Sequence, residues 1–179
     1  MTTVRERNPR GTGRNLIIAA AIDLIAERGL GAVRLRHVAE RAGVSLGSTT
    51  YHFADRDELL AAAIDEHTSA LLDAVAVTGA DEAGAAVREV FADRRTALVC
   101  AEIRLHATRD PQAAELADEV HRTLAVAVDT ARGRRRAAPA GDSVVATLNT
   151  LAVDTARAHT DPVTYAAAMR DRVDDAIAS

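Results

Sequence analysis

The stretch Val38–Leu60, VAERAGVSLGSTTYHFADRDELL, decides how this sequence is interpreted. It begins within a short predicted helix over residues 35–42, which ends at Gly43 because glycine readily takes the left-handed backbone that ends helices. Ser45 is placed to cap another short helix that ends near Phe53. Two short helices joined by a tight turn make a helix-turn-helix.

Helical periodicity continues on both sides of this motif. Apolar residues repeat at helical spacing over residues 14–28, and Asp55 with Glu58 forms a capping box that starts a long helix. Further helices are predicted over residues 81–92, 94–109, 111–132, 142–159 and 162–178. The sequence has no strand-like alternation, so we expect an all-α fold of about nine helices.

The composition agrees with such a fold. The chain has 179 residues, of which 48% are hydrophobic and only 2% aromatic, which favours helices packed closely through small side chains. Its single cysteine excludes an intramolecular disulfide, and no apolar stretch is long enough to span a membrane. We therefore expect a cytoplasmic protein with no membrane partner.

Charge divides the chain into a basic front and an acidic body. Nine Arg and five acidic residues precede residue 57, a net charge of +4, whereas the remainder carries −8. A basic front favours a polyanion-binding module joined to something else. We expect a flexible basic tail over residues 1–13, a helix-turn-helix domain over 14–56 and a second helical domain over 57–179. The arginines of the tail either enter a minor groove or belong to a merely disordered segment.

Residues 14–60 share the order and spacing of a known pattern. Its elements are Gly29, Val38–Ala39, Ala42–Gly43–Val44–Ser45, Gly47, Tyr51, His52–Phe53, Arg56 and Leu59–Leu60. This pattern resembles the DNA-binding domain of TetR-type transcriptional regulators. The resemblance implies a homodimeric helical regulator, usually a repressor, that binds a palindromic operator in double-stranded DNA. It also implies release by a small-molecule effector that binds the C-terminal domain, which is also the dimerisation domain. Arg34 departs from the pattern, because the family commonly has a capping Thr there.

The second short helix carries small polar side chains that can enter a major groove without steric conflict. Ser48, Thr49, Thr50 and Leu46 are expected to read bases, while Tyr51, His52 and Arg56 are expected to reach phosphates. The alternative is an ordinary pair of packed helices. The predicted DNA-binding residues are Arg14, Arg36, Ser45, Leu46, Gly47, Ser48, Thr49, Thr50, Tyr51, His52 and Arg56.

The predicted helix 94–109 carries polar residues beside an apolar stripe. Glu102 and His106 adjoin Leu98 and Leu105, an arrangement typical of a small-molecule pocket. The alternative is an exposed Glu–His pair at the edge of the core. The predicted ligand-binding residues are His67, Leu71, Leu98, Glu102, Leu105 and His106.

The last two predicted helices each carry a stripe of apolar and small residues at helical spacing. Such stripes either close the core of a single chain or, as the resemblance implies, pair with their copies in a second chain as a four-helix bundle. We expect the dimer. The predicted interface residues are Val145, Leu148, Ala152, Thr155, Ala166, Met169 and Val173.

Other chemistries lack their signatures in this sequence. His67, His106 and His121 lie on separate predicted helices where only the fold could unite them, and no Cys-x-x-Cys or His-x-x-x-His spacing is present, so no metal is expected. No nucleophile elbow, P-loop or dinucleotide fingerprint occurs, so neither enzymatic activity nor a cofactor is expected. The alternative function is a ligand-binding helical protein whose helix-turn-helix serves as a partner or dimer surface.

Overall fold

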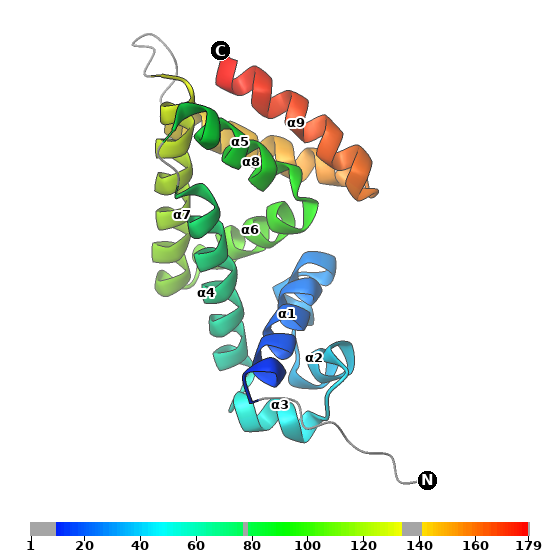
Figure 1. Ribbon diagram of the computed structural model, residues 1–179. Coiled ribbons are helices and arrows are strands. Elements are labelled where there is room, and N and C mark those ends of the chain that lie inside the picture. The colour runs from blue at the N-terminus through cyan, green and yellow to red at the C-terminus, as the bar shows by residue number, and fades with distance from the viewer. Residues whose placement is uncertain (1–9, 77–78, 134–140, 179) are drawn as a thin grey trace. The chain divides into compact units, whose positions relative to one another are not determined.

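The computed structural model describes residues 10–76, 79–133 and 141–178, which are helical apart from short connections (Figure 1). The described residues contain no strand, and the predicted all-α fold is confirmed. Residues 1–9 of the tail expected over residues 1–13 lie outside the described residues, whereas residues 10–13 belong to the first helix rather than to a tail. The elements are α1 (Arg10–Arg28), the 3-10 helix η1 (Leu30–Ala32), α2 (Leu35–Ala42), α3 (Leu46–His52), α4 (Arg56–Val75), α5 (Ala80–Ala92), α6 (Arg94–Ala107), α7 (Pro111–Ala131), α8 (Gly141–Ala158) and α9 (Pro162–Ala178).

Short polar side chains begin several of these helices, as their positions in the sequence predicted. Ser45 Oγ accepts a hydrogen bond from the Ser48 amide at 3.0 Å, and Asp55 Oδ1 accepts one from the Glu58 amide at 2.9 Å. These bonds satisfy amide groups that have no partner within the helix. Gly43 ends α2 with a left-handed φ of 67°, a conformation that side chains other than glycine resist.

Helix α2 begins without a side-chain cap. Arg34 has the extended backbone of an N-cap residue, with φ −138° and ψ 139°, but its side chain accepts no bond from the helix. Arg34→Ser should raise the free energy of unfolding by about 1 kcal/mol, because the hydroxyl can accept from a first-turn amide. Chemical denaturation followed by circular dichroism measures the effect. Arg34→Ala removes the same charge without adding an acceptor, and equal stability of the two variants would contradict the prediction.

The chain forms two compact units, which we call the amino-terminal unit (Met1–Glu66) and the carboxy-terminal unit (His67–Ser179). The boundary falls inside α4, later than the domain boundary expected at residue 56. Helix α4 therefore contributes its first half to one unit and its second half to the other.

In the amino-terminal unit, α1 packs against α2 and α3, and the two short helices pack against each other (Figure 1). Ile17, Val38 and Phe53 are almost fully buried there. Arg41 of α2 donates from Nη1 to Glu27 Oε2 of α1 at 2.9 Å, and this bonding lowers the pKa of Glu27. The amino-terminal unit thus holds its helix-turn-helix on α1 through apolar packing and an ion pair.

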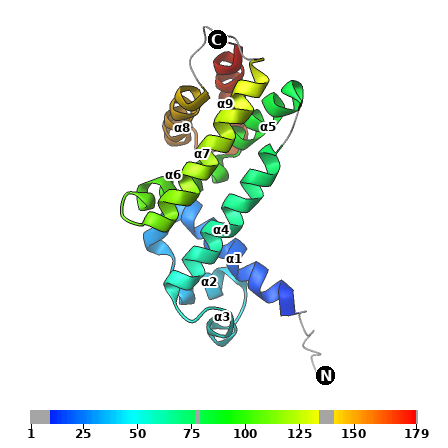
Figure 2. The ribbon, with the colours of Figure 1, turned by 90° about the vertical axis from the view of Figure 1, so that its left-hand side faces the viewer.

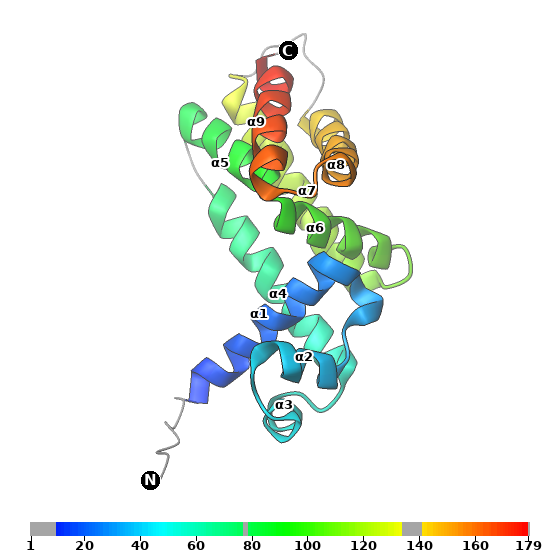
Figure 3. The same cartoon turned by 90° about the vertical axis from the view of Figure 1, so that its right-hand side faces the viewer.

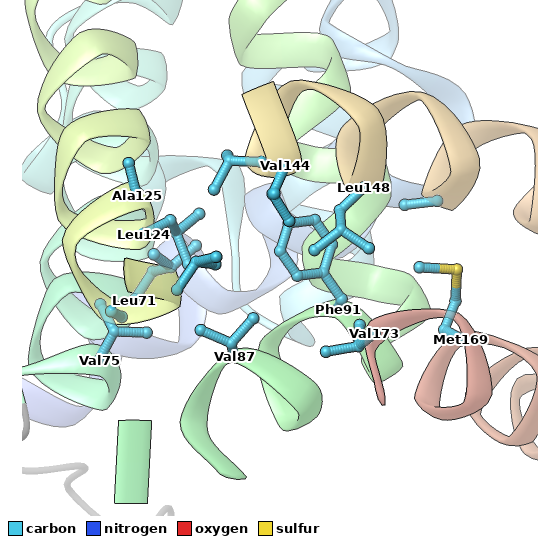
Figure 4. Close-up of a cluster of buried hydrophobic side chains, with 14 of the residues drawn as sticks. Leu71, Val75, Val87, Phe91, Leu124, Ala125, Val144, Leu148, Met169 and Val173 are labelled. Carbon is cyan, nitrogen blue, oxygen red and sulfur yellow. The ribbon is translucent and has the colours of Figure 1, made fainter. Parts of the chain in front are cut away.

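In the carboxy-terminal unit, α7 packs against α5, α6 and α8 (Figure 2), and α9 packs against α5 and α8 (Figure 3). Figure 4 shows side chains from α5, α7, α8, α9 and the end of α4 pointing toward one another in one apolar core. Phe91 lies in this core, and its carbonyl accepts a hydrogen bond from the Tyr165 hydroxyl at 2.9 Å. Burial raises the pKa of Tyr165, which keeps the hydroxyl protonated as a donor.

The core of the carboxy-terminal unit contains the residues that we expected at a dimer interface. Six of the seven are between 0% and 3% exposed within a single chain, and Ala166 is half-buried. For these six residues the prediction that they pair with a second chain is therefore wrong, because their side chains turn inward. Their periodicity indicated a buried face correctly but did not indicate what covers it. The six buried residues are Val145, Leu148, Ala152, Thr155, Met169 and Val173.

Candidate nucleic-acid interface and small-molecule pocket

Helix α3 presents a small and largely polar surface to solvent. Leu46 is 48% exposed and Tyr51 is 78% exposed, and Gly47 and Thr50 are also exposed. Thr50 Oγ1 donates to the Leu46 carbonyl at 3.2 Å, so its oxygen keeps lone pairs that can accept a further bond. The Tyr51 ring lies edge-on to His52, with ring centroids 5.1 Å apart. Ser45 and Ser48 are engaged in the cap of the helix, and both remain at least partly exposed.

Thr49 lies on the buried side of α3. Its side chain has no exposed surface, and its hydroxyl donates to the Ser45 carbonyl at 3.4 Å. The structure therefore contradicts the prediction that Thr49 faces a base. Three consecutive hydroxyl residues look alike in sequence, but a helix turns by about 100° per residue, so the middle one faces inward while its neighbours face solvent.

Two of the predicted arginines lie at the surface of the amino-terminal unit. Arg14 is exposed, and its guanidinium carbon lies 5.4 Å from the centroid of the Phe53 ring. Arg36 pairs with Glu40 at 3.2 Å, and 80% of the Arg36 side chain remains exposed. Both guanidinium groups therefore remain accessible to an anion from solvent.

Arg56 has a role that the sequence did not indicate. Its Nε donates to the Val33 carbonyl and its Nη2 to the Leu30 carbonyl, both at 2.9 Å, and its Nη1 bonds Asp57 at 3.2 Å. The side chain thus fastens the start of α4 to the segment around η1. Since a guanidinium has five N–H groups, two remain for the phosphate contact that we expected of Arg56.

A cavity of about 310 Å³ lies within the carboxy-terminal unit. This volume is at the lower end of the range of about 300–1,000 Å³ that is usual for small-molecule pockets. Helices α4, α6, α7 and α8 all contribute to its wall. The lining residues are His67, Thr68, Cys100, Ile103, Arg104, Ala117, Asp118, Val120, His121, Leu124 and Asn149.

His67 and Cys100 face each other in this pocket, with Nε2 and Sγ 3.8 Å apart. Burial lowers the pKa of His67 to about 4, and the charge of Arg95 lowers it further, so the imidazole is neutral at pH 7. Burial raises the pKa of Cys100 to about 12, so the thiol is protonated and a poor nucleophile. The pair therefore supplies neutral hydrogen-bonding groups rather than an ion pair.

Of the six predicted ligand residues, the structure places only His67 in the wall of this pocket. Leu71 belongs to the apolar core, Leu98 packs against that core, and Leu105 is 56% exposed. Glu102 is half-buried but is not among the lining residues, and His106 Nε2 lies 3.3 Å from Asp110 Oδ2.

Helix α6 does contribute to the pocket, but through the neighbouring face that carries Cys100, Ile103 and Arg104. The sequence showed that Cys100, His67 and His121 are polar residues on different helices, and only their packing reveals that they share one wall.

Within the part of the chain that the structure describes, no group of three or more His, Cys, Asp or Glu residues is arranged to hold a metal ion. Among the same residues, no helix is both long and apolar enough to cross a bilayer.

Comparison with known proteins finds similarity concentrated in the helix-turn-helix. Residues 17–63 match the family described as bacterial regulatory proteins, tetR family. The HTH-type transcriptional regulator BetI of Klebsiella pneumoniae is 40% identical over 62 residues, which cover 35% of this chain and 32% of that protein. The chain thus spans about a third of the length of the curated relatives that it matches.

Solved structures are similar over nearly the whole chain. A member of the TetR family from Streptomyces coelicolor, SCO1917, is 25% identical with a TM-score of 0.63, covering 93% of this chain and 99% of that one. The multidrug binding protein EbrR, solved in complex with proflavin, is 26% identical with a TM-score of 0.54, covering 92% and 99%. The similarity to these two proteins therefore includes the carboxy-terminal unit that holds the pocket.

Proposed function

We propose, from the chain's similarity to TetR-type transcriptional regulators, that it binds a palindromic DNA operator as a homodimer and represses transcription until a small molecule releases it. The exposed polar surface of α3 is the observation that carries this proposal. In this proposal the protein is a regulator rather than an enzyme, and it acts in the cytoplasm, where the DNA is.

In the proposed complex, α3 enters a major groove. Leu46, Ser48 and Thr50 contact base edges, because their small side chains let the helix approach closely. Tyr51, His52 and the exposed arginines of α1 and α2 contact phosphates, which fix the position of the helix but carry no sequence information. Thr49 has no place in this set because it is buried.

Two copies of the chain would present two such helices to two half-sites of the operator. We propose that the outward faces of α8 and α9 form the dimer, since their inward faces are occupied by the core of each chain. Val163, which is 77% exposed, and Ala167 lie on the outward face of α9. An isologous contact of these faces gives the two-fold symmetry that a palindrome requires.

Release by a ligand would act through α4. His67 and Thr68 line the pocket, and Arg56 lies at the start of the same continuous helix, where it holds the segment around η1. A ligand that shifts α4 would therefore act on a helix that belongs to both units. Reciprocal coupling then requires that the DNA-bound protein binds the ligand more weakly, typically by about 5- to 150-fold.

Selection from a pool of random DNA duplexes tests the proposed function directly. The purified chain is expected to enrich an inverted repeat, with an affinity that falls steeply as the salt concentration rises. Binding without sequence preference, or no binding, would refute operator recognition. That outcome would favour the alternative function, a ligand-binding helical protein whose helix-turn-helix serves as a partner or dimer surface.

Tyr51→Ala is expected to weaken binding to the selected repeat by about 1–3 kcal/mol, which is about 5- to 150-fold, because it removes a 78% exposed side chain of α3 that is proposed to bond a charged phosphate. Electrophoretic mobility shift at fixed salt measures the change. Val126→Ala is the matched control, since Val126 is 66% exposed on α7, outside the amino-terminal unit. An equal loss of affinity in both variants would contradict the placement of α3 in the DNA interface.

A further inference from the structure

Four polar side chains of the pocket wall, those of His67, Thr68, Cys100 and Asn149, carry no charge, and this bears on the ligand that the proposed regulator would sense. His67 and Thr68 are 7% and 3% exposed, and Cys100 stands opposite His67. With a neutral imidazole, a hydroxyl, a thiol and the amide of Asn149, the inner wall offers hydrogen bonds but no counter-charge. An ion placed against this wall would lose its hydration without gaining a partner, which is strongly unfavourable.

The charged groups of the pocket wall lie toward solvent and balance one another. Arg104 and Asp118 are both exposed and carry opposite charges. His121 Nε2 lies 3.6 Å from Asp142 Oδ1, so a carboxylate already stands beside this imidazole. The rim therefore provides no excess of either sign to hold an ionic ligand.

The pocket also lacks the aromatic rings that bind organic cations. The whole chain has two Tyr, two Phe and no Trp. Tyr51 and Phe53 belong to the amino-terminal unit, while Phe91 and Tyr165 are buried in the apolar core of the other unit and do not line the cavity. Cation–π attraction, which commonly holds quaternary ammonium and flat cationic ligands, is therefore absent from the described pocket wall.

We propose that this pocket takes an uncharged, largely aliphatic molecule that places one or two hydrogen-bonding oxygen atoms against His67 and Cys100. Ile103 and Leu124, both 4% exposed or less, supply apolar wall for the rest of the molecule. Since a cavity of about 150 Å³ accommodates benzene, a cavity of this size suits about ten to twelve non-hydrogen atoms. The inference rests on the proposed function only in naming this molecule as the effector.

A matched set of probes tests the charge preference. Nonanol, nonanoate and nonylammonium share one aliphatic chain and differ in the charge of the head group, and proflavin adds a flat aromatic cation. Calorimetric titration of the full chain without DNA should show nonanol binding at least about tenfold more tightly than each of the other three. Equal or tighter binding of any charged probe, or no binding of nonanol at millimolar concentration, would overturn the proposal.

Two variants of the pocket wall and one control variant tie the result to this pocket. Asn149→Asp adds a carboxylate to the wall with little change in shape, and it should weaken nonanol and strengthen nonylammonium by about tenfold each. Asn15→Asp, at an exposed position on α1, makes the same change of net charge and should leave both affinities unaltered. Ala117→Leu should abolish nonanol binding by filling the cavity. Unaltered nonanol binding to Ala117→Leu would place the alcohol elsewhere and contradict the assignment.

The probe titrations test the ligand class and the DNA selection tests the regulator, so either hypothesis can be refuted without the other. Selective binding of an inverted repeat together with preferred binding of a charged probe would overturn only the ligand class. Preferred binding of nonanol without selective DNA binding would refute the regulator while keeping the pocket as a site for uncharged molecules.

Discussion

Met169→Glu is expected to unfold the carboxy-terminal unit rather than to separate two folded copies of the chain. Met169 has no exposed surface and lies in the apolar core with Leu148 and Val173 (Figure 4). A carboxylate at this position has no counter-charge, so the free energy of unfolding should fall by about 3–5 kcal/mol. That loss is a large share of the stability of about 5–15 kcal/mol that is usual for a domain.

The matched control is Ala167→Glu, which adds the same charge to the exposed face of the same helix. We expect this variant to keep its helical content and denaturation midpoint but to sediment as a monomer, because the proposed dimer face includes Ala167. Circular dichroism in urea and sedimentation velocity distinguish the two effects. If the Met169→Glu protein is folded and monomeric, the inward-facing residues of α8 and α9 form the dimer interface, and the core described above is contradicted.

Gly141→Ala is expected to destabilise the carboxy-terminal unit by about 3 kcal/mol, the upper end of the usual cost of overpacking. A Cβ at Gly141 would lie 2.3 Å from the Ala125 carbonyl oxygen, a main-chain atom of α7 that cannot turn away. The Gly141 amide also donates to Asp129 Oδ1 at 3.0 Å, which fixes the start of α8 on α7. Relief of the clash would require the two helices to move apart.

Gly84→Ala should instead stabilise the carboxy-terminal unit. A Cβ there would meet Ala131 Cβ at an ordinary 3.6 Å, and alanine is favoured over glycine inside a helix by about 1 kcal/mol. Thermal unfolding of both variants measures the pair. If Gly141→Ala is as stable as the unaltered chain, α8 does not approach α7 as closely as described.

Local sequence signals predicted the helices and their ends well. Asp55 and Ser45 cap helices where the sequence placed them, and Gly43 takes the predicted left-handed turn. Helix caps and tight turns depend on residues within one helical turn of one another, so the spacing of these residues in the sequence is enough to predict them. The helical periodicity of α8 and α9 likewise predicted which faces are buried.

The spacing of residues in the sequence did not predict which part of the chain packs against each helix face. Arg56 bonds carbonyl groups more than twenty residues earlier in the chain, and the pocket wall joins His67, Cys100, His121 and Asn149 from four helices. Such contacts depend on how helices pack, and one sequence gives no direct measure of that packing. The expected ligand residues on α6 therefore lay on a face beside the one that borders the cavity.

The placement of the two tyrosines gives the protein an optical label on each unit. Because the chain has no tryptophan to mask it, its tyrosine emission is measurable and comes from Tyr51, which is 78% exposed on α3, and Tyr165, which is enclosed in the core and bonded to the Phe91 carbonyl. Acrylamide should quench the first fluorophore and spare the second. Emission from Tyr51→Phe then reports on the interior of the carboxy-terminal unit alone, while Tyr165→Phe leaves a signal that belongs to the surface of α3.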